Sequence, residues 1–230
     1  MRYLIAVITI LMCVKDIRSQ TYEIGPYIGG ANYIGDVGST SYIAPKSLLA
    51  GGIFKWNRSK RHSFRFSILH TSLEADDKNS DENRRQERGY SFKNEITEAS
   101  LGIEYTFWEW NLHNLKPQLT PYLYTGLTGV FTDNQYVDRT NRIVPGDNKI
   151  TAAIPMVIGV KGTLNTNWVL GIEAGARYTF TDNLDGSNPE EFDGGEVYPS
   201  FGNPNTNDWY MFVGVTLTYT FGRKPCYCAF

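Results

Sequence analysis

The chain alternates apolar residues with polar or small ones, at a period of two, in several long segments. From Trp209 to Phe221 every odd-numbered residue is apolar or aromatic, whereas the even-numbered positions from Gly214 onward hold glycine or threonine. The same alternation runs from Thr97 to Phe107 and from Trp168 to Phe180. Because successive side chains of a strand point to opposite faces, this pattern predicts β-strands with one apolar face and one polar or small face.

Five further segments show a weaker form of this pattern and bring the number of predicted strands to eight. They are Tyr22–Ile34, Leu48–Trp56, Ser63–Leu73, Leu119–Phe131 and Ile150–Lys161. Strands of roughly 9 to 11 residues cross a bilayer when they are tilted by about 45°. Each of the eight segments is long enough to do so.

The connections between the predicted strands alternate between short and long. Those at Asn57–His62, Trp108–Pro117 and Gly162–Asn167 are short or moderate, and the long polar ones are Gly35–Lys46, Glu74–Tyr90, Thr132–Asn148 and Thr181–Asp208. This alternation is typical of outer-membrane barrels. The sequence therefore predicts an all-β, eight-stranded antiparallel transmembrane barrel of the outer membrane, with short periplasmic turns, long extracellular loops and both mature termini in the periplasm. The alternative is a soluble β-sandwich or lipocalin-like barrel, but sandwiches rarely carry such long apolar faces on successive strands.

Composition agrees with a barrel that meets lipid on one face and a polar interior on the other. Aromatic residues make up 14% of the chain, yet the mean hydropathy is only -0.34. Aromatic girdles mark both interfaces of such barrels, and we expect Trp56, Phe107, Trp108, Trp110, Trp168 and Phe221 at the periplasmic one. A net charge of -2 gives no support to nucleic-acid binding.

The N-terminus is typical of a Sec signal peptide. Arg2 precedes an apolar run from Leu4 to Val14 that is too short to span a membrane as a helix. We expect a signal peptide at residues 1–19, the barrel at 20–221 and a periplasmic C-terminal tail at 222–230. Cys13 suggests a lipoprotein as an alternative, but Met12 stands where lipoprotein processing needs a small residue.

If the apolar faces meet lipid, the lumen receives four acidic and four basic side chains. They are Glu23, Lys55, Arg65, Glu98, Glu104, Lys161, Glu173 and Arg177, accompanied by Tyr122 and Tyr124. An eight-stranded barrel is just wide enough for side chains to fill it. We therefore expect a charge-balanced structural plug without an open pore. A catalytic carboxylate pair within this set is the alternative.

The two sides of the predicted barrel differ in charge. The periplasmic turns and tail carry six basic residues against the single acid Glu109, namely Arg58, Lys60, Arg61, Lys116, Arg223 and Lys224. Such a rim can dock an acidic partner or simply balance the fold. The last long loop carries Asp182, Asp185, Glu190, Glu191, Asp193, Glu196 and Asp208 without Lys or Arg. A third functional hypothesis, an adhesin or loop-based binder, depends on this loop alone. The spacing of its acids does not fit a calcium-binding EF-hand loop, so we predict no metal.

The sequence offers little support for catalysis. It has no Gly-x-Ser-x-Gly elbow, no His-Glu-x-x-His and no phosphate-binding loop. We therefore predict neither an enzyme nor a cofactor. The competing hypothesis is a small lipid-modifying enzyme or ligand-binding barrel acting at the extracellular rim. It would rest on His70, because His62 and His113 fall on the periplasmic side.

The tail from Gly222 to Phe230 is not required by a barrel. It contains Cys226 and Cys228, which an exported protein exposes to an oxidising compartment. A bridge between them would close a very small, strained ring, and two thiolates are too few for structural zinc. A disulfide to a partner protein, an internal bridge and free thiols all remain open.

Three segments resemble the PorG-like outer-membrane β-barrel component of the type IX secretion system of Bacteroidota. They are Glu23–Gly38 (EIGPYIGGANYIGDVG), Arg88–Phe107 (RGYSFKNEITEASLGIEYTF) and Thr181–Ser187 (TDNLDGS). In the third, Asn183 and Gly186 depart from the family's usual TDYLDDVS. The resemblance implies a non-enzymatic subunit that anchors or docks a periplasmic lipoprotein ring at the outer membrane. Partners would then be ring proteins and membrane lipid, with the basic residues Arg58, Lys60, Arg61, Arg223 and Lys224 and the two tail cysteines as candidate contacts.

Overall fold

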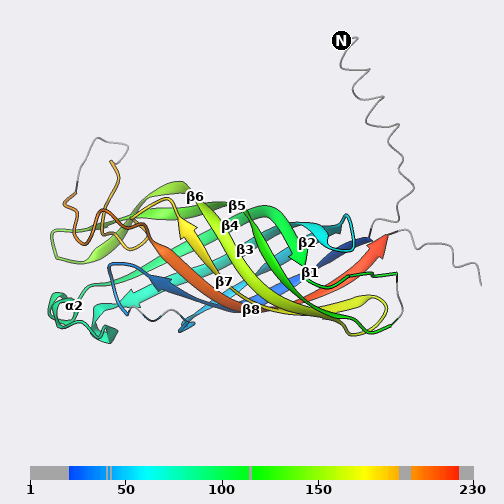
Figure 1. Cartoon of the computed structure of the whole chain (residues 1–230). Helices are drawn as coiled ribbons and strands as arrows, with labels where there is room; N and C mark the ends of the chain where they lie inside the picture. Colours follow the sequence, from blue (N-terminus) through cyan, green and yellow to red (C-terminus); the bar gives the residue numbers. More distant parts are fainter. Residues whose placement is uncertain (1–20, 40, 42, 114–115, 192–197, 223–230) are drawn as a thin grey trace, which may run out of the picture.

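The protein is a closed antiparallel β-barrel in the computed structural model (Figure 1), which describes residues 21–39, 41, 43–113, 116–191 and 198–222. The strands are β1 (Thr21–Ile34), β2 (Ser47–Asn57), β3 (His62–Asp76), β4 (Ser91–Thr106), β5 (Leu119–Val137), β6 (Ile143–Thr163), β7 (Trp168–Thr179) and β8 (Trp209–Gly222). Each strand pairs with the next, and β8 closes the barrel on β1, with Tyr22 opposite Phe221 and Ile34 opposite Trp209. The predicted fold class is confirmed.

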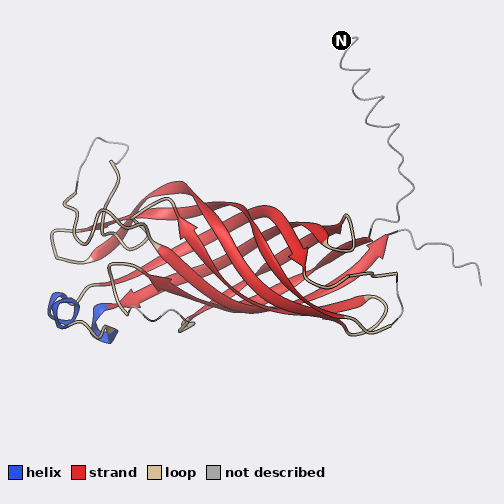
Figure 2. Cartoon of the chain, viewed as in Figure 1, coloured by secondary structure: helices blue, strands red, loops and turns tan. Residues whose placement is uncertain are grey.

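The barrel has two unlike ends (Figures 1 and 2). The turn end, which the sequence predicts to be periplasmic, carries the connections 58–61, 107–118 and 164–167 together with the start of β1 and the end of β8. The loop end carries the remaining connections, among them the short helices η1 (Asp77–Asn79) and α2 (Asn83–Arg88). No helix of the described residues is long and apolar enough to cross a membrane.

Three strands continue at least six residues further toward the loop end than the alternation predicts. β4 begins at Ser91, β5 runs to Val137 and β6 starts at Ile143. The long loop predicted at Thr132–Asn148 is therefore wrong, since only residues 138–142 connect β5 to β6. The polar composition of this segment is typical of a loop, yet backbone pairing needs no apolar side chains and continues beyond the lipid-facing part of the strands.

The outward face of the barrel is an apolar band. Every strand contributes at least one exposed large apolar side chain to it, with Leu101 at 62%, Ile158 at 60% and Ile172 at 57% exposure as examples. Proteins that stay in water rarely expose a contiguous apolar surface of this kind. The band therefore faces lipid, and the chain is a transmembrane barrel of the type found in outer membranes.

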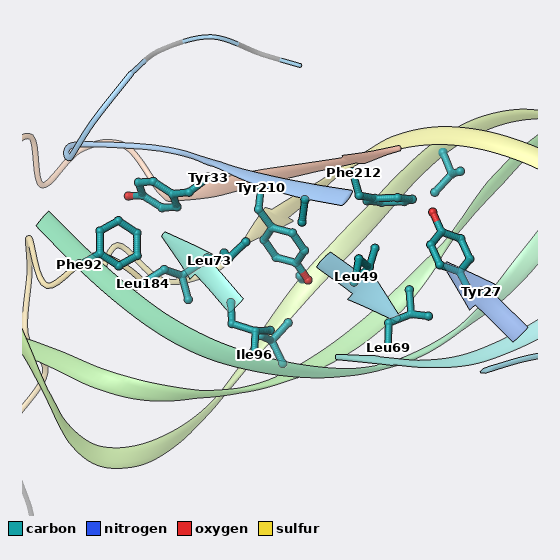
Figure 3. Packing of buried hydrophobic residues seen from close by; sticks show 14 of the residues in the cluster. Tyr27, Tyr33, Leu49, Leu69, Leu73, Phe92, Ile96, Leu184, Tyr210 and Phe212 are labelled. Carbon is teal, nitrogen blue, oxygen red and sulfur yellow. The ribbon is translucent and has the colours of Figure 1, made fainter. Parts of the chain in front are cut away.

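The inward face divides into an apolar cluster and a charged network. Figure 3 shows the cluster, which includes Tyr33, Leu73, Phe92 and Ile96 together with Leu184 from the last loop. Leu49, Leu69, Tyr27 and Phe212 continue this cluster along the barrel. The charged side chains lie largely in the half that approaches the turn end, where Glu23 stands opposite Lys55 and Thr220 in the register.

Candidate functional site

The structure places all eight predicted lumen charges in the interior, each with 3% or less of its surface exposed. A two-bond link across the barrel joins β3 to β7. Both terminal nitrogens of Arg65 donate to the two carboxylate oxygens of Glu173, each at 2.7 Å. Tyr122 donates its hydroxyl to the same carboxylate, and the guanidinium of Arg65 lies 4.4 Å from the ring centre of Tyr124.

A second group of charges gathers around Glu104 near the turn end. The Lys161 ammonium lies 2.6 Å from one of its carboxylate oxygens and the Lys55 ammonium 2.8 Å from the other. Below them, the indole of Trp110 folds under the lumen, with its ring centre 4.7 Å from the Lys161 nitrogen. Only 3% of Trp110 is exposed. Its predicted place in the lipid-facing aromatic girdle is therefore wrong, because the residue belongs to a connection that turns inward.

The remaining two acids are bonded as well, Glu98 by an arginine and a tyrosine and Glu23 by neutral donors. Arg177 donates to Glu98 at 2.7 Å, and Tyr210 donates its hydroxyl to the same carboxylate. Glu23 accepts from the amide of Asn57 at 2.9 Å and from the hydroxyl of Thr218 at 2.8 Å. Buried charges are tolerated where they are paired and hydrogen-bonded. The network therefore fills the barrel and ties opposite walls together, and any partner or ligand has to meet the protein at its ends or its outer face.

At the turn end, some of the predicted basic side chains are bonded to other parts of the protein. Lys60 pairs with Glu109 at 3.0 Å, and Arg61 donates to the carbonyl of Phe107 at 2.5 Å. These contacts hold the β2–β3 turn against the β4–β5 connection. Arg58 is exposed, and among the described residues no ion pair involves it. Arg58 is thus the basic side chain of this turn that is free to meet another molecule.

A cavity of about 260 Å³ lies beside Arg58 at this end. Its walls include Asn57, Ser59, Trp110 and His113. The indole nitrogen of Trp110 is buried and has no hydrogen-bond partner within the described chain. The cavity therefore has a cationic rim, which suits an acidic group.

The loop end is closed by a cap built from the three segments that carry the sequence resemblance. In the first contact, the backbone N–H of Val37 donates to Asp185 at 3.1 Å. Asn94 of β4 donates its amide to the carbonyl of Leu184 at 2.8 Å. Arg88 donates to the carbonyl of Asp36 at 2.7 Å. These segments lie far apart in the sequence, yet they meet in one structure.

Acidic residues of the last loop that appeared available for ligands are internal connectors of this cap. Asp208 accepts the backbone N–H of Leu184 at 2.8 Å and the hydroxyl of Tyr33, and Asp185 accepts the N–H of Ser187 at 2.9 Å. Burial raises the pKa of Asp185 and of Asp208. Among the described residues, no group of His, Cys, Asp and Glu side chains is arranged to hold a metal ion.

Asp182 differs from its neighbours because it is buried without partners. Only 9% of the residue is exposed, and neither carboxylate oxygen has a hydrogen bond within the described residues. Burial raises the pKa of Asp182 to about 7, and the nearby carboxylates of Asp36 and Asp185 add to the rise. Asp182 is therefore a group of the cap that changes charge near neutral pH.

Gly186 and Asn183, the two residues that depart from the TDYLDDVS motif, each have a structural role. Gly186 has a φ of 80°, a conformation that suits glycine. An added Cβ there would lie 2.9 Å from a methyl group of Ile143. Asn183 donates its amide to the carbonyl of Gln135 at 3.0 Å and so attaches the loop to β5.

The remaining predicted contacts fall outside the described residues. These are Arg223, Lys224, Cys226 and Cys228 of the tail, together with the signal peptide and its cleavage site. The disulfide to a partner stays a prediction.

Comparison with known proteins identifies the family. The family described as a domain of unknown function, DUF6089, matches residues 1–230. The chain belongs to this family. A search of curated proteins found no match.

Solved structures with a similar fold are outer-membrane proteins. The N-terminal β-barrel domain of Pseudomonas aeruginosa OprF has a TM-score of 0.45 and 13% identity, covering 87% of this chain and 97% of that one. Neisserial surface protein A has a TM-score of 0.45 and 9% identity, covering 88% and 97%. The Yersinia pestis attachment invasion locus protein Ail has a TM-score of 0.40 and 9% identity, covering 89% and 99%. The strand pairing of this DUF6089 member itself establishes its fold.

Proposed function

We propose that this DUF6089 protein is a non-enzymatic outer-membrane subunit of a type IX secretion system that docks a periplasmic lipoprotein ring. The observation that carries the proposal is the contact between the three resembling segments. Segments that carry a family resemblance but lie apart in sequence form one cap through the bonds of Val37, Arg88 and Asn94. A resemblance confined to general barrel features would not include loop residues joined in this way.

The filled interior supports an anchoring role. Charges and tyrosines occupy the lumen, and cross-barrel pairs such as Arg65–Glu173 hold its walls together. A barrel of this kind offers a rigid membrane anchor rather than a passage for secreted protein. Function then resides in surfaces outside the lumen.

We assign docking to the turn end. Arg58 is exposed beside a cavity of about 260 Å³ whose wall includes Trp110. An acidic side chain of a ring protein could pair with the guanidinium, since charge-assisted bonds to arginine are strong and directional. The tail that follows β8 begins on this same side, since β8 ends there.

The test is a pull-down from gently solubilised membranes with Arg58→Glu. We expect co-purification of the ring proteins to fall by about tenfold, the equivalent of one lost charge-assisted bond. The matched control is Arg84→Glu, which reverses an exposed arginine of α2 at the loop end and should leave co-purification unchanged. Equal recovery from both variants would remove the turn end from the docking hypothesis.

The tail is tested separately by deleting residues 223–230, a cut that keeps Gly222 because it pairs with Thr21 at the barrel seam. We expect the barrel to insert and the partner to be lost. The variant Cys226→Ser with Cys228→Ser, run on non-reducing gels, tests the covalent form. If the gel loses no species of higher mass, the disulfide hypothesis is wrong while the docking hypothesis stands on the deletion.

A further inference from the structure

A pocket of about 530 Å³ lies on the outer face of the barrel, over β3 to β6. Its lower wall is apolar and contains Phe131 and Ile150, which are 48% and 71% exposed and belong to the lipid-facing band. His70 lies in the same row of the register as these two residues, and the upper wall, further toward the loop end, is polar and contains Glu95 and Asp133. The pocket therefore spans the line where the apolar band gives way to the polar extensions of the strands.

The charges of the upper wall do not balance. Lys149 also lines the pocket, but it pairs with Glu190 at 3.3 Å. Neither Glu95 nor Asp133 takes part in an ion pair within the described residues. The nearby Lys93 stands opposite Glu74 in the register, so these two can offset each other. Two carboxylates are thus left to face a ligand from two adjacent strands.

Neutral hydrogen-bonding groups complete the site. Thr97 bonds the ring of His70, with 3.0 Å between the Thr97 hydroxyl oxygen and Nδ1. The amide of Asn148 is a further member of the lining. A nucleophile, a base and an acid that orients the base are needed for acyl transfer, and no described hydrogen bond joins a carboxylate to the His70 ring. The arrangement suits binding and not catalysis.

We propose that this pocket binds the primary ammonium headgroup of a membrane lipid, with Glu95 and Asp133 as its counter-charges. A primary ammonium carries three donors, which the two carboxylates and a neutral acceptor such as Asn148 can take up. Phe131 and Ile150 then contact the upper part of the acyl chains. This inference uses the outer face only and does not depend on the proposed role in secretion.

The experiment is native mass spectrometry of the purified full-length barrel in detergent, titrated with phosphatidylethanolamine, phosphatidylcholine or phosphatidylglycerol. We expect phosphatidylethanolamine to bind most tightly. Phosphatidylcholine has the charge without the donors, and phosphatidylglycerol lacks the cation. The double variant Glu95→Gln with Asp133→Asn should lower the affinity for phosphatidylethanolamine by about tenfold or more, in line with lost bonds to a charged group.

The matched control is Glu87→Gln, which removes an exposed acid of α2 outside the pocket and should leave the affinity unchanged. Heat-dependent gel migration verifies that each variant is folded. If the double variant does not fold, Glu95→Gln alone carries the test at an exposed position. Equal binding of the three lipids, or undiminished binding of phosphatidylethanolamine by the folded variant, would overturn the proposal.

Discussion

The pair formed by Arg65 and Glu173 allows a direct test of how the charged interior stabilises the barrel. Both side chains are fully buried and joined by two bonds of 2.7 Å. In Glu173→Gln one acceptor oxygen becomes an amide that cannot accept from the guanidinium, and the buried arginine loses its counter-charge. Removing one partner of a buried ion pair costs about 3 to 5 kcal/mol.

The surroundings of the pair place the stability cost of Glu173→Gln at the lower end of that range. A second carboxylate, that of Glu104, lies 4.0 Å from the Arg65 guanidinium and offsets part of the loss. Its compensation is limited because Glu104 already serves Lys55 and Lys161. We therefore expect Glu173→Gln to lower the free energy of unfolding by about 3 kcal/mol.

A double variant separates the charge from the packing. Arg65→Met with Glu173→Gln removes both charges, while the glutamine still offers Tyr122 an acceptor. Since apolar replacement of a whole buried pair is often neutral, we expect most of the loss to be recovered. The assay is guanidinium unfolding in detergent, followed by tryptophan fluorescence. The reasoning is refuted if Glu173→Gln costs less than about 1 kcal/mol, or if the double variant is less stable than the single one.

Two further predictions concern the ends of the barrel. The pKa of Asp182 is about 7 in the folded protein against an ordinary 3.8. Between these two pH values the folded state holds a proton that the unfolded state has released. The stability of the cap therefore falls as the pH rises through this window. Hydrogen exchange of residues 182–187, corrected for the intrinsic rate, should be slower at pH 5 than at pH 8, and Asp182→Asn should abolish the difference; an unaltered difference in that variant would assign it to another group. At the turn end, Trp110→Ala should cost about 3 to 5 kcal/mol on guanidinium unfolding because it empties a buried site, whereas Trp110→Phe should retain most of the stability; equal losses would show that the indole does not close the lumen.

The alternation of residues predicts the barrel well because a lipid-facing strand needs an apolar side chain at every second position. It also predicts which charges point inward, since Glu173 and Arg177 occupy the polar positions of a strand whose other face is apolar. The partners of these charges could not be predicted. Arg65 meets Glu173 across the lumen, and such contacts depend on strand tilt and stagger.

The connections between the strands could not be predicted for a different reason. Beyond the membrane no alternation is imposed, so the extension of β5 to Val137 left no signal in the sequence. The inward turn of Trp110 likewise had none, because an aromatic residue near a rim is ordinarily an interface anchor. Leu184 carries a signal that our predictions did not use. An apolar residue within a polar loop favours burial, and the residue is fully buried in the cap.

The seam between β1 and β8 has a consequence for biogenesis. All other strand pairings join neighbours in sequence, but this one brings Thr21 beside Gly222. Closure therefore waits until the whole chain has been delivered, and until then two unpaired strand edges are open to other chains. A nascent barrel of this kind needs a holding chaperone during transit, and premature truncation anywhere before β8 should yield aggregate instead of a shortened barrel.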